Sequence, residues 1–301
     1  MKPNLLFWVA IVFLCFACKK TETPSFLHIE DIDLYVGSNS EAGTDDHGIS
    51  DAWVYLNDQL VGIYELPATI PVVTEGLQKV SVLAGIKNNG IQSARVIYPF
   101  YDSYNGNLTF IPGDTIDFAG DSENTTIING HTCPVVEYFD EGLIFWNERF
   151  DEAGINFEST DNSLTDMTIT QDPDLVFNYD PSSGSHGSGL VILNQDASYF
   201  EVTSTHEFSP IKGQKVYLEL HYFTECAISI GVYENAPTHT KVYGKGLYPV
   251  ENWNKAYIEL TQEVAQRANA TSYSIFIEGE LETGQGECQI LLDNIKLIYP
   301  E

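Results

Sequence analysis

Short apolar runs separated by turn residues recur along most of the chain, and in HIEDIDLYVG (28–37) apolar and polar positions alternate. The runs are rich in Val, Ile, Tyr and Phe, and Gly, Asn, Asp and Pro lie between them. Alternation with a period of two places successive side chains on opposite faces of a strand. Many short strands with frequent turns are typical of β-sandwiches, so the pattern predicts an all-β fold.

The length of 301 residues corresponds to about two domains. The first, at residues 26–112, contains a predicted hairpin whose turn is Asn57-Asp58, since both residues tolerate a left-handed conformation. The second, at residues 141–301, holds about nine strand-like runs, which suits a jelly roll or a related β-sandwich. Residues 113–140 are expected to form a bridge with one or two strands.

The expected strands of the second domain are FWNERFD, LVFNYD, GLVILNQD, SYFEVTST, QKVYLELHYF, CAISIGVYE, KAYIELT, YSIFIEGEL and CQILLDNIKLIY. Helical periodicity is almost absent elsewhere. Residues 259–273 (ELTQEVAQRANATSY) are the best candidate and predict one short helix or helical turn.

The chain begins with an apolar run at residues 5–17, preceded by Lys2 and followed by Cys18. As a helix the run would be about 20 Å long, which is too short for a hydrocarbon core of about 30 Å. A short apolar core that ends in the small residue Ala17 is typical of a secretory signal.

Residues 14–18 (LCFAC) resemble the lipobox of bacterial lipoproteins. The resemblance implies a signal peptide at residues 1–17, lipid on Cys18 and a polar tether at residues 18–25, so the protein would be held on a membrane by its N-terminal lipid. Lys19 stands where an Asp would retain a lipoprotein at the inner membrane, which favours the outer membrane. An ordinary cleaved signal with a coincidental cysteine is the alternative.

The formal net charge is -29. Binding to nucleic acid depends on Lys and Arg that neutralise phosphates, so this charge argues against nucleic acid as a partner. It argues equally against adsorption to anionic lipid. Solubility explains the charge more simply than a specific role in cation binding.

Three cysteines remain after the predicted processing: Cys133, Cys226 and Cys288. They cannot all pair within one chain. Cys226 and Cys288 each begin an apolar run and could meet as strand neighbours in a disulfide, or they could be two buried thiols. The sequence has no CxxC, so it suggests neither a zinc site nor a thioredoxin-type redox site.

Two resemblances concern the domains. VYLND (54–58), VG (61–62), LP (66–67) and EGLQKVSV (75–82) resemble a PEGA-like domain. The resemblance implies that the first domain is a small β-sandwich, which makes two β-sandwich domains in all, and that it is a non-catalytic spacer or contact module. FWNERFDEAGI (145–155), GSHGSGLVIL (184–193), ENWNKAYI (251–258) and ILLDNIKL (290–297) resemble galactose-binding-like and carbohydrate-binding-module jelly rolls. The whole chain resembles a group of uncharacterised two-domain lipoproteins of Gram-negative bacteria.

The jelly-roll resemblance implies a structural Ca²⁺ held by Asp151 and Asp293, although Asp151 stands where Glu is usual. The alternative is that Asp293 caps the final turn without a metal. Tyr243 and Tyr248 lie in YGKGLYP, a sequence with two glycines that is expected to form a loop, and they are the candidates for a glycan-binding rim. Tyr at a surface loop is equally common in protein contacts. Other aromatic residues are available, with Trp253 expected in the core: Tyr179, Tyr199, Tyr233 and Trp253.

No catalytic motif is present: GxSxG, HExxH, the P-loop and GxGxxG are all missing from the sequence. With 43 acidic residues, a pair of carboxylates suited to glycoside hydrolysis is easily found by coincidence. We therefore predict a lipid-anchored envelope protein that is not an enzyme and that binds a glycan or an envelope protein. The alternatives are a structural subunit of a cell-surface complex and, less favoured, a glycoside-processing enzyme.

Overall fold

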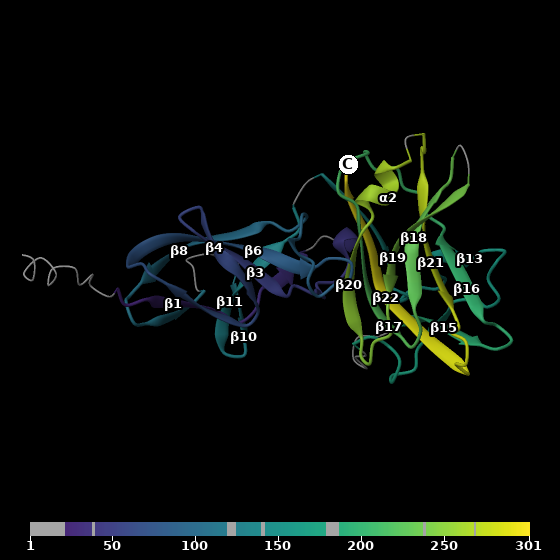
Figure 1. Cartoon of the computed structure of the whole chain (residues 1–301), viewed down its shortest axis with the longest axis horizontal. Coiled ribbons are helices and arrows are strands. Elements are labelled where there is room, and N and C mark those ends of the chain that lie inside the picture. Colours follow the sequence, from purple (N-terminus) through teal and green to yellow (C-terminus); the bar gives the residue numbers. More distant parts are fainter. Residues whose placement is uncertain are drawn as a thin grey trace, which may run out of the picture.

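The computed structural model describes residues 22–37, 40–118, 125–139, 142–178, 187–236, 239–267 and 269–301. These ranges are almost entirely β-structure, arranged as two bodies along the long axis of the molecule (Figure 1). The signal peptide and Cys18 lie outside the described residues. Within those ranges the helical elements are η1 (Ser40–Ala42) and α2 (Thr261–Ala265), and none is long and apolar enough to cross a membrane. The short helix predicted within residues 259–273 is confirmed by α2.

The first body is built from small sheets with the strand orders β5-β1-β9, β10-β11-β2 and β4-β3-β6-β7, with β8 also paired to β6. The turn between β3 and β4 lies at Asn57 and Asp58, whose φ angles are 49° and 65°, so the predicted hairpin is confirmed. The strands of this body are β1 (Ser25–Ile29), β2 (Asp33–Tyr35), β3 (Asp51–Leu56), β4 (Gln59–Glu65), β5 (Ala68–Val72), β6 (Gly76–Lys87), β7 (Arg95–Ile97), β8 (Ser103–Phe110), β9 (Thr115–Asp117), β10 (Thr125–Ile128) and β11 (His131–Glu137).

The segment expected to be a bridge, residues 113–140, instead contributes three strands to the first body. β9 pairs in parallel with β1, and β11 pairs in parallel with β2. Phe118, Val136 and Tyr138 belong to the hydrophobic core of this body. Parallel pairing joins strands that are distant along the chain, so alternation within each strand could not reveal it.

The second body is a β-sandwich of two sheets. The sheet on the side of the first body, called the near sheet, has the order β14-β15-β22-β17-β20, with β12 also paired to β22. The sheet on the opposite side, called the far sheet, has the order β13-β16-β21-β18-β19. The strands of this body are β12 (Leu143–Glu148), β13 (Phe157–Ser159), β14 (Thr168–Thr170), β15 (Ser188–Asn194), β16 (Tyr199–Ser204), β17 (Tyr217–Thr224), β18 (Ile228–Glu234), β19 (Thr240–Leu247), β20 (Asn254–Glu259), β21 (Tyr273–Glu280) and β22 (Glu287–Pro300).

The inward side chains of both sheets form one core, which confirms the predicted all-β sandwich of jelly-roll type. Two features of the strand prediction were wrong. The described part of LVFNYD forms turns, and there Phe177 stacks on His221 with ring centroids 3.9 Å apart. The sequence YGKGLYP, expected to be a loop, lies largely within β19.

Cys226 and Cys288 form a disulfide, with their Cα atoms 6.0 Å apart. Cys226 lies two residues beyond the end of β17, and Cys288 lies in β22. The β17–β22 register that pairs Thr224 with Ile290 continues to these positions, so the bond joins neighbouring strands of the near sheet. Cys133 is buried and free. The structure thus favours the disulfide over a pair of buried thiols.

The outer face of the near sheet packs against the first body. Tyr217 and Tyr257 of this face belong to the core of the first body, with their rings 5.2 and 5.0 Å from that of Tyr98. Glu219 lies at the centre and accepts hydrogen bonds from the hydroxyls of Tyr98 (2.7 Å) and Tyr138 (2.9 Å). The two bodies therefore share a continuous buried interface.

Candidate functional site

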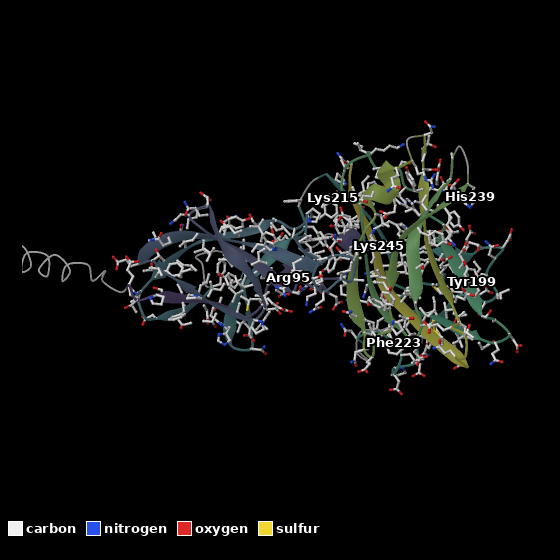
Figure 2. All side chains as sticks on the ribbon, in the orientation of Figure 1. Arg95, Tyr199, Lys215, Phe223, His239 and Lys245 are labelled. Atoms are coloured by element: carbon white, nitrogen blue, oxygen red, sulfur yellow. A yellow bond between two sulfur atoms is a disulfide. The ribbon has the colours of Figure 1, made fainter. Side chains whose placement is uncertain are left out.

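The outer face of the far sheet is turned away from the first body. Figure 2 shows Tyr199 and His239 on this side of the molecule. Because side chains alternate along strands, the neighbours of Tyr199 and Glu201 on β16 point into the core while these two point outward. Antiparallel pairing of four strands brings together the residues that we call the far-face cluster: Tyr199, Glu201, Tyr233, Lys241, Tyr243, Phe276 and Glu278.

A charged network lies at the centre of the far-face cluster. The ammonium group of Lys241 donates hydrogen bonds to the carboxylates of both Glu201 and Glu278. The hydroxyl of Tyr199 lies 2.5 Å from Glu201 Oε2 and 2.6 Å from Glu278 Oε2. The Tyr233 hydroxyl also donates a hydrogen bond to Glu201, which is only 1% exposed. One lysine and two tyrosines thus satisfy two carboxylates on a sheet surface.

The pKa values in this network follow from burial and hydrogen bonding. Burial alone would raise the pKa of Glu201, but hydrogen bonds from Lys241, Tyr199 and Tyr233 outweigh it and lower the pKa to about 2. Burial would lower the pKa of Lys241, and its bonds to the two carboxylates raise it instead. At neutral pH Glu201 is therefore a carboxylate and Lys241 carries its ammonium charge.

Aromatic rings pack against one another beside this charged network. Phe276 is fully buried although it lies outside the sandwich core, because Tyr233 and Tyr243 cover it with ring centroids 5.5 Å from its own. Lys241 Nζ lies 4.5 Å from the Phe276 centroid and 5.2 Å from that of Tyr243. Tyr243 itself is 61% exposed, so a supported aromatic ring faces solvent.

An open depression of 440 Å³ adjoins the cluster at Tyr199 and Glu278. Ser229 and Glu280 also line it and add polar groups to its wall. A glycine is required at position 231, where the strands come closest, because a Cβ there would lie 2.3 Å from Val242 O and 2.6 Å from the ring of Phe276. The face therefore combines an exposed ring, hydrogen-bonding groups and an adjacent hollow.

The two tyrosines predicted from the sequence have different positions. Tyr243 is part of the far-face cluster, on β19. Tyr248 is 76% exposed, one residue beyond the end of β19, and no contact between the two rings is found among the described residues. Glu201, Lys241 and Glu278 were not predicted, because only the strand pairing brings them together.

Asp151 and Asp293, the predicted calcium ligands, lie close enough for their charges to interact. Burial raises the pKa of Asp293 to about 7, and the charges of Asp151 and Asp46 add to this effect. Asp293 accepts hydrogen bonds from Ser188 Oγ (2.5 Å) and from the backbone N–H of Asn294 (2.7 Å). Repelling carboxylates at a buried position suit a cation, but within the described ranges the pair joins no group of three acidic, His or Cys side chains.

No protein-family profile matches the chain, and no curated protein matches it. Among solved structures it is similar to a family 29 carbohydrate-binding module variant complexed with mannohexaose, at 11% identity and a TM-score of 0.34, covering 52% of this chain and 91% of that one. A variant complexed with cellulohexaose gives 10% identity and a TM-score of 0.33, with the same coverage. At these values the likeness carries no argument about function. The residues themselves define a two-body β protein with one open aromatic and acidic face.

Proposed function

We propose that the protein is a non-catalytic binding protein that takes a glycan on the far-face cluster. The observation that carries the proposal is the exposed ring of Tyr243, which is supported from below by Phe276 and flanked by Lys241. Binding sites typically combine apolar or aromatic surface with a few well-placed polar groups. This face has both, next to an open hollow.

The chemistry of the face favours a neutral sugar. A sugar ring has an apolar face that can pack on Tyr243 and hydroxyls that both donate and accept hydrogen bonds. Glu278 and Glu280 offer acceptors at the hollow, and Ser229 can serve either role. The formal charge of -29 disfavours polyanionic ligands.

The test is a glycan array followed by calorimetry on the chain from residue 19 onward. We expect saturable binding to one class of neutral glycan, weakened at least about ten-fold by Tyr243→Ala, because hot-spot aromatic residues contribute about 2 kcal/mol or more. Tyr35→Ala is the matched control, since Tyr35 is 55% exposed on the first body. Tyr248→Ala shows whether the second predicted tyrosine takes part.

Absence of binding across the array would overturn the glycan proposal, as would equal affinity of the parent and Tyr243→Ala. The alternative function is docking of an envelope protein, and a second surface favours it. Trp53 lies between Ile63 and Leu83 on adjacent strands of the first body, on the side away from the core residues Ala52 and Val54. Such an apolar row suits a protein contact. Co-purification of one fixed partner, lost on Ile63→Glu, would support this alternative.

Calcium is proposed as a structural ion at Asp151 and Asp293. The support is the buried carboxylate of Asp293, whose pKa is raised by burial and by like charges. We expect 1 mM Ca²⁺, about the affinity range of extracellular modules, to raise the melting temperature of the parent but not of Asp293→Asn. Equal shifts in both proteins would contradict the proposal.

Lipid attachment at Cys18 and an outer-membrane location are proposed from the sequence alone. The support is the lipobox-like LCFAC and the Lys at position 19. Growth of an expressing bacterium with a labelled fatty acid should label the parent and not Cys18→Ala. Membrane fractionation would then give the location, and recovery of the label with the inner membrane would contradict the outer-membrane assignment.

A further inference from the structure

Two histidines and an aspartate meet at the surface of the first body, away from the far-face cluster. His28 lies on β1, Asp117 on β9 and His131 at the start of β11. The parallel register of β1 and β9 pairs His28 directly with Asp117. One ligand-type atom from each of the three side chains lies within 4.8 Å of the others. No other group of three such side chains converges this closely in the part of the chain that the structure describes.

The surroundings of His28 hold one of its ring nitrogens by a hydrogen bond and leave the other facing a carboxylate. Nδ1 lies 3.0 Å from Thr69 Oγ1, which is the residue paired with His28 on β5. Nε2 is buried and has no hydrogen bond. With the proton on Nδ1, the Thr69 hydroxyl accepts a hydrogen bond, and the Nε2 lone pair is available to a cation bound between it and the Glu30 carboxylate. Metal-ligating histidines usually have this arrangement, in which the second nitrogen is held by a neighbouring oxygen.

His131 and a second carboxylate complete the group. His131 Nδ1 lies 3.0 Å from Asp117 Oδ1, and the rings of His131 and His28 are 4.5 Å apart. Glu30 Oε2 lies 3.4 Å from His28 Nε2. Asn129, in the left-handed turn of the β10–β11 hairpin, donates a 2.8 Å hydrogen bond to Glu30 Oε1. The hairpin thus holds a fourth possible ligand beside the first three.

We propose that His28, Asp117 and His131 bind a zinc-class divalent metal ion, with Glu30 or water as the fourth ligand. Two imidazoles and a carboxylate suit zinc, whereas Ca²⁺ takes oxygen ligands only. Tetrahedral zinc with bonds of about 2.1 Å places its ligand atoms about 3.4 Å apart, so small side-chain rotations close the group. The ion would fasten β1 and β9 to the β10–β11 hairpin.

The experiment is a calorimetric titration of Zn²⁺ into the metal-free chain from residue 19 onward. We expect one ion per chain with micromolar or tighter affinity. Asp117→Asn and His131→Gln should each weaken binding at least about ten-fold. Two variants serve as controls that leave the affinity unchanged. His47→Gln removes a histidine whose Nε2 lies 3.5 Å from Asp33 Oδ1, and Cys133→Ala removes the nearby free thiol.

Asp117→Asn keeps the shape of the side chain, so it tests the ligand role even if His131→Gln unfolds the hairpin. Its melting temperature without metal shows whether the fold is intact. The proposal is overturned if the chain shows no saturable Zn²⁺ binding with a dissociation constant below about 10⁻⁴ M. Unchanged affinity in a folded Asp117→Asn protein, or loss of binding in Cys133→Ala, also overturns it.

Discussion

At the residue scale, Lys241 is the group on which the far-face cluster depends. Its ammonium group bonds to both Glu201 and Glu278 and lies over the ring of Phe276. Glu201 is 1% exposed, so its charge could not be hydrated if the lysine were lost. A buried charge left without its partner costs several kcal/mol.

Lys241→Met should lower the free energy of unfolding by about 3 kcal/mol, because it removes the charge and keeps most of the side-chain volume. Urea denaturation measures the change. The double variant Lys241→Met/Glu201→Gln should recover part of the loss, since the unpaired carboxylate is then neutral. A double variant less stable than Lys241→Met would contradict this account.

The lowered pKa of Glu201 also predicts a pH dependence. Its pKa is about 2 in the folded protein, against about 4.3 in an unfolded chain. A lowered pKa gives stability that is complete above pH 4.3 or so and is lost as pH falls towards 2. The stability difference between the parent and Glu201→Gln should therefore be constant from about pH 8 to 5 and shrink below about pH 4. A difference that does not change between about pH 5 and 2.5 would contradict the assignment.

At the scale of the elements, β18 and β19 position the aromatic rings of the far-face cluster. Their register shifts between Ile230 and Gly231, opposite Gly244. The ring of Phe276 lies over Gly231, where a Cβ would be 2.6 Å from it. The missing side chain thus makes room for the ring that supports Tyr243.

Gly231→Ala should destabilise the protein by about 2 kcal/mol and weaken the proposed glycan binding, because the new methyl group collides with Val242 O and Phe276. Gly246→Ala on β19 is the matched control, since its Cβ would meet nothing closer than Ile228 O at 3.7 Å. Thermal unfolding and calorimetry measure both effects. Equal behaviour of the two variants would contradict the steric argument.

The same elements show what the sequence could predict. The Asn57-Asp58 hairpin was predictable because both signals, turn residues and flanking alternation, are local. β19 was not, because Gly244 and Gly246 are typical of loops, whereas here Gly244 lies at a register shift within a strand, where a Cβ would be 2.7 Å from Ile230 O. The predicted Tyr243 is in the cluster.

The polar neighbours of Tyr243 in the far-face cluster and the His28–Asp117 pair could not be predicted from the sequence. His28 and Asp117 meet through a parallel pairing of β1 with β9, and no local pattern specifies which strands pair. Lys241 reaches Glu201 across two intervening strands, β18 and β21. The sequence therefore identified exposed aromatic residues but could not identify their neighbours.

At the scale of the whole molecule, a buried charged group joins the two bodies. Glu219 is fully buried, and its carboxylate lies 3.1 Å from Lys255 Nζ. Burial raises its pKa, but the charges of Lys255 and Lys296 and the hydroxyls of Tyr98 and Tyr138 outweigh this and lower it. Burial lowers the pKa of Lys296 to about 8, with Glu219 acting in the opposite direction. The stability of the interface thus depends on Glu219 and both lysines being present together.

Glu219→Ala should cost about 4 kcal/mol, because it leaves two lysines buried without their common partner. Since the core continues across the interface, the parent should unfold in one calorimetric transition and Glu219→Ala in two. Asp58→Asn is the control, because Asp58 pairs with the half-exposed Lys79 on the surface of the first body and should contribute about 1 kcal/mol or less. Two transitions in the parent would contradict a shared core.

The sandwich uses its two faces unequally: the near face is covered by the first body, and the far face is open at the opposite end of the molecule from the start of β1 (Figure 1). A chain tethered through its N-terminus would carry that open face at the tip of its long axis. The first body then sets a reach, the height above the point of attachment at which a ligand is met. Lengthening or shortening that body would change which ligands are accessible without changing how tightly each one binds.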